Sequence, residues 1–242
     1  MGWAERAADR SPVVHRSRSR SIQQTRGIVD AARRLIAVKG SSFTTQELVK
    51  EAGVAMQTFY RHFTGKDQLL LAVIEDVVAE SAVRFEEAAR AIPDPLSRLR
   101  YYLTTTVDGL FEDIGWSRFV TSEHWRLRER FPKEIADADQ PFTDLIEREL
   151  RAAQDAGLLP PSDVGRDAEM VARVVMSVFH HYAFAHGRWS PQDIGDYLWE
   201  FCLGGISRAD NPRLTATTVA PAASAGLETG GHPAEEQQNT TP

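Results

Sequence analysis

A short stretch near the N-terminus concentrates side chains that can form hydrogen bonds with a nucleic acid. Gln57, Thr58, Tyr60 and His62 lie close together, and Lys66 follows them. Glutamine can form paired hydrogen bonds with adenine, and threonine can bond a base or place its methyl group against thymine. Tyrosine, histidine and lysine bond phosphate oxygens, which fixes register but carries no sequence information. These residue types therefore predict contacts with double-stranded DNA.

Two short helices around a tight turn are expected to position these side chains. Thr44 and Glu47 have the spacing of a capping box, which begins a helix. Gly53 follows that helix and supplies a turn that can take a positive φ. A second short helix is expected over about residues 56–63, and Gly65 ends it.

Longer helices are expected on both sides of this pair. Residues 22–39 place Ile28, Ala32 and their neighbours on one apolar face, and Gly40 follows as a stop signal. Another long helix is expected over about residues 66–90. The order helix, helix, tight turn, helix predicts a helix-turn-helix domain. The alternative is a helical hairpin that contacts protein and uses its aromatic residues for packing.

The same stretch resembles the helix-turn-helix of the TetR family of bacterial repressors. The family pattern reads roughly T-T-x-x-[IL]-A-x-x-A-G-V-S-x-x-[TS]-[LF]-Y-x-[HY]-F-x-x-K-x-x-L, and the resemblance covers about a fifth of the chain strongly. The matching residues are Thr44, Thr45, Leu48, Ala52, Gly53, Val54, Thr58, Phe59, Tyr60, His62, Phe63, Lys66 and Leu69.

The resemblance implies a DNA-contacting role for eight residues. The start of the first short helix would contact a phosphate and a base, the first turn of the second would face bases, and the rest of the second helix and the start of the next would bond phosphates. In that order, the residues are Thr45 and Gln46, then Met56, Gln57 and Thr58, then Tyr60, His62 and Lys66.

Three positions depart from the family pattern. Ala55 stands where the family has a serine N-cap, so about 1 kcal/mol of helix capping is missing. Val49 replaces the usual alanine. Met56 offers no hydrogen bond, only an apolar contact such as one with a thymine methyl group.

The charge distribution divides the chain into a basic head and an acidic body. Residues 1–66 carry 12 Lys and Arg against 5 Asp and Glu, whereas residues 67–242 carry 16 against 29. The two net charges, +7 and −13, add to the −6 of the whole chain. A basic head is typical of a DNA-binding domain joined to a regulatory body. A chance division of surface charge is the other interpretation.

Four segments are predicted along the chain. Residues 1–21 are rich in Arg and Ser and are expected to form a disordered basic arm. This arm either touches DNA phosphates or is a terminal extension without a role. Residues 22–68 form the helix-turn-helix domain, and residues 69–209 form a ligand-binding and dimerisation domain. Residues 210–242, rich in Thr, Ala, Gly and Pro, are expected to be a disordered tail.

The fold class is predicted to be all-α, with a three-helix helix-turn-helix domain followed by a larger helical domain. No stretch alternates with period two for long enough to be a strand. Further helices bring the total to about nine, and they are expected near residues 96–113, 116–128, 134–156, 166–185 and 191–208.

The last two helices are expected to form a homodimer interface. Residues 166–185 are apolar on two faces, one with Val171 and Val175 and another with Met170 and Val174, and a helix must bury both. Gly204 and Gly205 would allow close approach of helices, and the resemblance implies a four-helix dimer interface here. A larger monomeric core is the alternative. Two copies would read two half-sites of a near-palindromic operator.

The middle of the chain is rich in aromatic residues, which are expected to line a pocket for a small hydrophobic effector. The resemblance implies such a pocket, and core packing is the other interpretation for most of these side chains. The candidate pocket residues are Trp116, Phe119, Trp125, Phe142 and Phe179.

Other classes of protein find little support in the sequence. No run of about 18 apolar residues exists, so no membrane span is expected. The N-terminus lacks a signal-like apolar region, and the single cysteine, Cys202, has no internal partner, so a cytoplasmic location is expected. No cofactor or metal site is expected, because the adjacent His180 and His181 point to different helix faces and no HExxH motif joins them. The sequence contains neither a nucleophile elbow nor a Gly-rich phosphate-binding loop, so no motif of this kind indicates an enzyme.

The sequence therefore predicts a TetR-like transcriptional regulator, a repressor that binds its operator as a homodimer and responds to a small effector. A sequence-indifferent DNA-coating protein and a small-molecule enzyme on an all-α scaffold are the alternatives.

Overall fold

The computed structural model describes residues 12–185 and 187–207, and every regular element within them is a helix. These ranges hold nine α-helices and one 3-10 turn, which confirms the all-α prediction. None of the described helices is long and apolar enough to cross a membrane.

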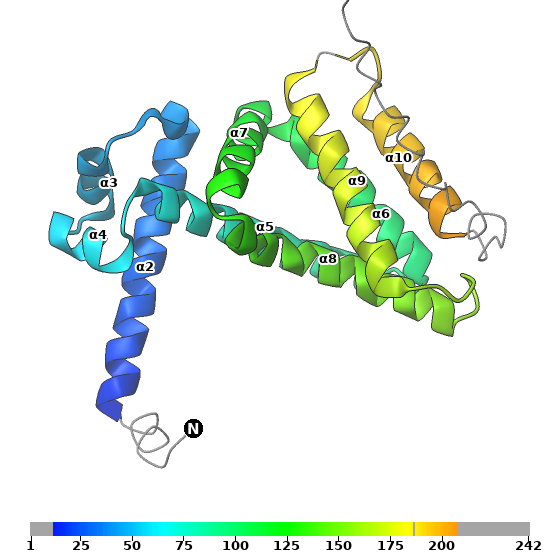
Figure 1. Ribbon diagram of the computed structural model, residues 1–242, viewed down its shortest axis with the longest axis horizontal. Helices are drawn as coiled ribbons and strands as arrows, with labels where there is room; N and C mark the ends of the chain where they lie inside the picture. Colours follow the sequence, from blue (N-terminus) through cyan, green and yellow to red (C-terminus); the bar gives the residue numbers. More distant parts are fainter. Residues whose placement is uncertain (1–11, 186, 208–242) are drawn as a thin grey trace, which may run out of the picture. The chain divides into compact units, whose positions relative to one another are not determined.

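The N-terminal elements form a helix-turn-helix domain (Figure 1). Their core is closed by side chains from each helix, including the completely buried Ala31 and Phe59. The elements are α2 Pro12–Lys39, η1 Gly40–Ser42, α3 Thr45–Ala52, α4 Met56–His62 and α5 Lys66–Ala89.

Local signals explain where the two short helices begin and end. The Thr44 hydroxyl accepts from the Glu47 backbone N–H, and the Glu47 carboxylate accepts from the Thr44 backbone N–H, which confirms the capping box. Gly53 ends α3 with φ +65°, a left-handed conformation that costs a residue with a Cβ atom more than glycine. At Ala55, α4 begins without a side-chain cap, as the sequence predicts.

Helix α2 is longer than expected. The sequence predicts a helix from about residue 22 and a disordered arm before it, but α2 already begins at Pro12. The prediction is therefore wrong for residues 12–21, where polar residues without hydrophobic periodicity hid the helix. Residues 1–11 of the predicted arm and the predicted tail at 210–242 lie outside the described residues.

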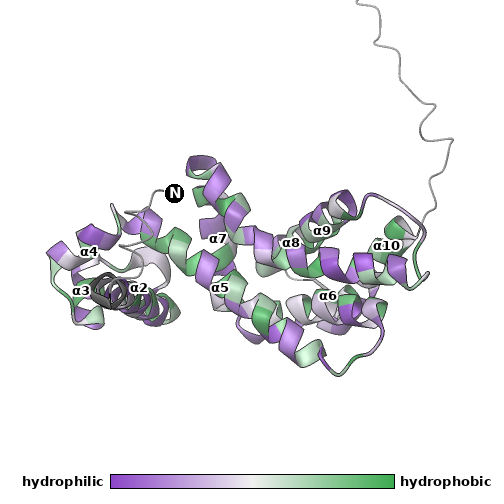
Figure 2. Ribbon diagram, turned by 90° about the horizontal axis from the view of Figure 1, so that it is seen from below, coloured by the Kyte–Doolittle hydropathy of each residue, from purple (hydrophilic) through white to green (hydrophobic). Residues whose placement is uncertain are grey.

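Five helices build the body of the protein. Each carries hydrophobic residues on part of its surface and hydrophilic residues on the rest (Figure 2). Those of α6, α8, α9 and α10 meet in a second core around Tyr102 and Leu103, whereas the buried hydrophobic residues of α7 belong to the N-terminal core. The helices are α6 Pro95–Glu112, α7 Ile114–Arg130, α8 Pro132–Asp155, α9 Val164–Phe184 and α10 Pro191–Ile206.

Helix α5 belongs to both cores. Its first turns bury Leu69 and Val73 in the N-terminal core, and its last turns place Phe85 and Ala89 in the core of the body. Val78, midway along the helix, packs against both. One continuous helix therefore connects the helix-turn-helix domain to the body.

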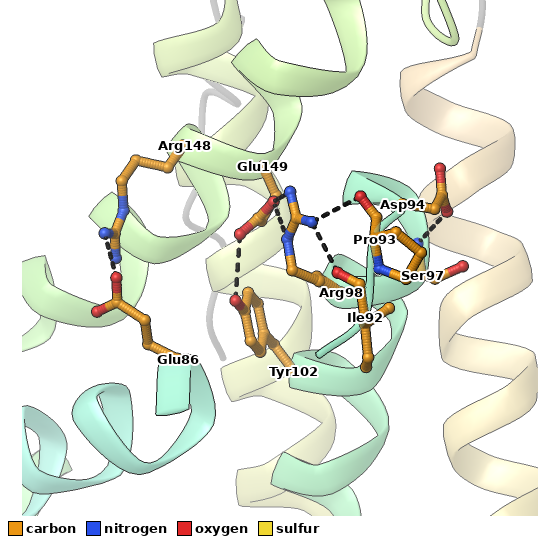
Figure 3. A network of polar contacts seen from close by, with 9 residues as sticks. All are labelled: Glu86, Ile92, Pro93, Asp94, Ser97, Arg98, Tyr102, Arg148 and Glu149. Carbon is orange, nitrogen blue, oxygen red and sulfur yellow. Dashed lines mark hydrogen bonds and ion pairs between the residues drawn. The ribbon is translucent and has the colours of Figure 1, made fainter. Parts of the chain in front are cut away.

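A partly buried ion pair fastens α6 to α8 (Figure 3). Arg98 Nη2 lies 2.8 Å from Glu149 Oε2, and the Tyr102 hydroxyl donates to Glu149 Oε1 at 3.1 Å. Arg98 Nη1 also donates to the carbonyls of Ile92 and Pro93, both at 2.9 Å. Burial beside the Glu149 carboxylate raises the pKa of Tyr102 to about 12, so its hydroxyl remains a donor.

Removing the arginine of this pair should destabilise the protein. We expect Arg98→Met to lower the free energy of unfolding by about 2–4 kcal/mol, because Glu149 would be left as a buried, unpaired charge. Arg148→Met is the matched control, since the Arg148–Glu86 pair is exposed and worth only about 0–1 kcal/mol. Urea denaturation of both variants measures the difference, and equal losses would contradict this assignment.

Candidate nucleic-acid interface and ligand cavity

Helix α4 presents a polar surface because its apolar residues anchor it from the other side. Phe59 is fully buried, and its ring stacks on that of Phe63 with 5.8 Å between the centroids. Gln57 is exposed, Thr58 is half-buried and Tyr60 remains 56% exposed. A helix of this size fits the major groove of DNA, and these three side chains are free to reach it.

Helix α3 precedes α4 in the chain, and the two predicted DNA-contacting residues at its start differ in exposure. Gln46 is exposed, whereas Thr45 is half-buried. Glu47 holds the helix start in place, and its hydrogen bond from Lys39 lowers its pKa to about 2. The capping box therefore stays ionised and intact at neutral pH.

Met56 has a packing role in addition to any contact with a base. It is half-buried and packs against the N-terminal core. The part of its side chain that remains accessible is apolar, in keeping with a contact to a methyl group rather than a hydrogen bond.

His62 turns toward α2 rather than outward. Its Nδ1 lies 3.1 Å from the Thr25 hydroxyl, and its Nε2 lies 3.4 Å from Gln24 Oε1. Arg61 also bonds Gln24, with Nη2 donating to the same oxygen at 3.1 Å. The end of α4 is therefore held against α2 by a small group of polar side chains.

Lys66 also has a structural role that its sequence pattern does not reveal. Its ammonium donates to the carbonyl oxygens of Ser41 and of Phe43, the latter at 2.7 Å. It also lies 4.3 Å from the centroid of the Phe43 ring, and partial burial lowers its pKa. Lys66 thus ties the start of α5 to the segment between α2 and α3.

The helix-turn-helix region of this chain is similar in sequence to that of known regulators. Residues 28–73 match the family model described as bacterial regulatory proteins, tetR family. Residues 28–73 therefore form a DNA-binding domain of this family. An uncharacterized HTH-type transcriptional regulator of Haemophilus influenzae is 30% identical over 128 residues, which are 52% of this chain and 57% of that relative. The match thus spans little more than half of the relative's length.

Two solved structures share the fold of this protein. Thermus thermophilus FadR, in complex with lauroyl-CoA, has a TM-score of 0.63 at 18% identity and covers 78% of this chain and 97% of its own. RolR, in complex with resorcinol, has a TM-score of 0.61 at 18% identity, covering 78% of this chain and 89% of its own. At these identities the likeness establishes the fold alone.

The body of the protein contains a cavity of about 850 Å³. Its apolar wall includes Val78, Phe85 and Met176, and its polar wall includes Thr105 and Thr106. Three of the five predicted pocket residues line it, namely Trp116, Phe142 and Phe179.

The other two predicted pocket residues do not line this cavity. Phe119 is buried in the N-terminal core, 5.4 Å from Trp116 between ring centroids, and does not line the cavity. Trp125 is 59% exposed and packs against His180. Aromatic residues identify apolar surface, but they do not reveal which face of α7 meets which neighbouring helix.

Charged residues line the cavity where sequence analysis expected only aromatic ones. Arg84 on α5 has no carboxylate partner among the described residues, and its Nη2 donates to the Ser81 hydroxyl at 3.2 Å. Arg128 on α7 pairs with Asp139 on α8 at 2.8 Å. The consecutive threonines at 104–106 of α6 were the sequence signal for a polar wall.

Two histidines lie behind the cavity wall, between α7 and α9. His124 is 3% exposed and has its Nε2 at 3.2 Å from Asp139, while His180 lies 5.1 Å from the His124 ring. Burial lowers the pKa of His180 to about 4. His186 lies outside the described residues, and no set of ligating side chains within the described ranges could hold a metal ion.

Acid should destabilise the protein through His180. Its folded pKa of about 4 lies below the ordinary value of 6.5, so the unfolded state binds more protons between these values. Stability should therefore fall as the pH is lowered from about 6.5 toward 4. His180→Phe should weaken that dependence in urea denaturation series, whereas His181→Gln, at an exposed position, should keep it. If the unfolding free energy of His180→Phe depended on pH as steeply as that of the wild type, His180 would not be the group responsible.

Proposed function

We propose that this protein is a TetR-family repressor that reads a near-palindromic operator as a homodimer. The observation that carries the proposal is the exposed polar surface of α4, with Gln57 and Tyr60 held outward by the buried Phe59. Gln57 would read a base edge in the major groove, and Tyr60 would bond a phosphate. Since Lys66 and His62 are engaged within the protein, their phosphate contacts would use only their remaining donor capacity.

The dimer would form through α9 and α10. On α10, Tyr197 is 72% exposed and Phe201 is 63% exposed, and Met170 on α9 is exposed as well. At Gly204 and Gly205 an added Cβ would meet nothing within 4 Å, so a second helix could approach them closely. An exposed apolar face of this kind is typical of a protein–protein interface. A two-fold dimer would present two copies of α4 to two half-sites.

The effector would be a small amphipathic molecule that occupies the cavity. Phe142, Phe179 and their neighbours would contact its apolar part, and Arg84 would meet a polar or anionic group. The solved structures with lauroyl-CoA and with resorcinol support a ligand of this kind, since both have an apolar part and a polar part.

Helix α7 would carry the effect of the ligand to the DNA-binding surface. It lines the cavity through Ser117 and Val120, and near its end Arg126 lies 2.8 Å from Asp67 at the start of α5. Arg130 also pairs with Asp67. A shift of α7 would therefore move the first turn of α5 and, through it, the segment that precedes α3. A coupling of about 1–3 kcal/mol would change DNA affinity roughly 5- to 150-fold.

Removing the Gln57 amide should relax base specificity. We expect Gln57→Ala to lose about 1–3 kcal/mol of discrimination at one position of each half-site, because the paired hydrogen bonds to a base disappear. Fluorescence anisotropy with duplexes that differ by single base pairs measures this. Tyr60→Phe is the control, and it should weaken binding to all of these duplexes alike. Unchanged base preferences in Gln57→Ala would show that α4 is placed wrongly, and a protein that coats DNA would show no preference at all.

Filling the cavity should abolish effector binding. A thermal-shift screen of fatty acids, acyl-CoAs and phenols should find compounds that raise the Tm of the wild type. Met176→Trp should remove the shift by occupying the cavity, while Val83→Trp, on the exposed side of α5, should retain it. A response only to very polar compounds, or an equal shift in both variants, would contradict an apolar effector site.

A further inference from the structure

Residues 17–23 of α2 form helical turns without a packed face. All seven are exposed, and from residue 17 onward the first buried residue of α2 is Ile28. In Figure 1 this part of α2 extends past α3 and α4. A helical segment that buries no side chain gains nothing from a core, so its sequence is not explained by the fold.

This segment carries only positive charge. From Pro12 to Val29 the sequence contains several arginines and no Asp or Glu. Arg18, Arg20 and Arg26 are exposed and form no ion pair with a carboxylate of the described residues. Further along the same helix, by contrast, Arg33 pairs with Asp76 and Glu80 at 2.8 Å. From residue 17 to Ile28, α2 therefore carries basic side chains that no carboxylate of the described residues neutralises.

Helical geometry places two of these arginines beside the DNA-reading helix. Gln24 and Thr25 contact the end of α4. Arg20 precedes Gln24 by four residues and Arg18 precedes Thr25 by seven, so the two arginines lie about one and two helical turns beyond the contact with α4 and project from different sides of α2. Seven residues of helix span about 10 Å, which is about the rise of three base pairs.

We infer that Arg18 and Arg20 form a second DNA contact, with the sugar–phosphate backbone within about three base pairs of the bases that α4 reads. The inference rests on the proposed operator binding. A guanidinium group makes two parallel hydrogen bonds to a phosphate and remains charged at any relevant pH. Such a contact adds affinity and strengthens the dependence on salt, but it does not read the sequence.

The test is the salt dependence of operator binding by the full-length chain. Two arginines in each protomer of a dimer would neutralise four phosphates. Arg18→Gln/Arg20→Gln should therefore reduce the slope of log K against log salt by about 3 to 4 and weaken binding at least about tenfold at 0.1 M salt. Its base preferences should match those of the wild type. Glutamine and arginine have similar helix propensities, so circular dichroism should show α2 retained.

Two further variants separate this contact from a general effect of charge. Arg90→Gln/Arg166→Gln removes the same charge from exposed positions at the ends of α5 and α9 and should leave the slope unchanged. Arg18→Lys/Arg20→Lys should keep most of the slope. A wild-type slope in Arg18→Gln/Arg20→Gln, or an equal reduction in the Arg90/Arg166 variant, would overturn the inference while leaving operator binding intact. A wild type that prefers no sequence would overturn the proposed function and this inference with it.

Discussion

The packing of α5 into two cores is the constraint on which the rest of the structure depends. Leu69 and Val73 complete the core that holds α3 and α4, while Phe85 and Ala89 belong to the core of the body. Because a helix is stiff along its axis, a displacement at one end is transmitted to the other. The same helix lines the cavity through Val77 and Val78. The position of the polar surface of α4, which we propose reads DNA, would therefore depend on the shape of the cavity.

The polar surface of α4 arises because only a few apolar side chains attach this helix to the domain. The helix has only seven residues, and Phe59, with Phe63 just beyond its end, supplies most of the apolar surface that attaches it to the domain. Its other side chains are then available for contacts outside the protein. The missing cap at Ala55 leaves the start of the helix with unsatisfied N–H groups, so α4 depends on tertiary packing more than on its own helix-forming signals.

Sequence reasoning succeeded where the signals are local. The capping box of Thr44 and the turn at Gly53 act within a few residues, and helices α3 to α10 lie where periodicity and stop signals place them. It failed where the outcome depends on contacts between distant segments. The carbonyl partners of Lys66 come from about 25 residues earlier in the chain, and Phe119 joins the N-terminal core although it lies near cavity residues in sequence. The early start of α2 was missed because an exposed polar helix leaves no hydrophobic pattern.

The most direct measurement is selection of bound sequences from a random duplex pool at near-physiological salt. The account predicts enrichment of an inverted repeat, because two copies of α4 related by a two-fold axis must meet two half-sites in successive major grooves, about 10 base pairs apart from centre to centre. Enrichment of an unrepeated half-site would contradict the dimer. No enrichment, either with the free protein or after addition of metabolite extract, would contradict sequence-specific DNA binding itself.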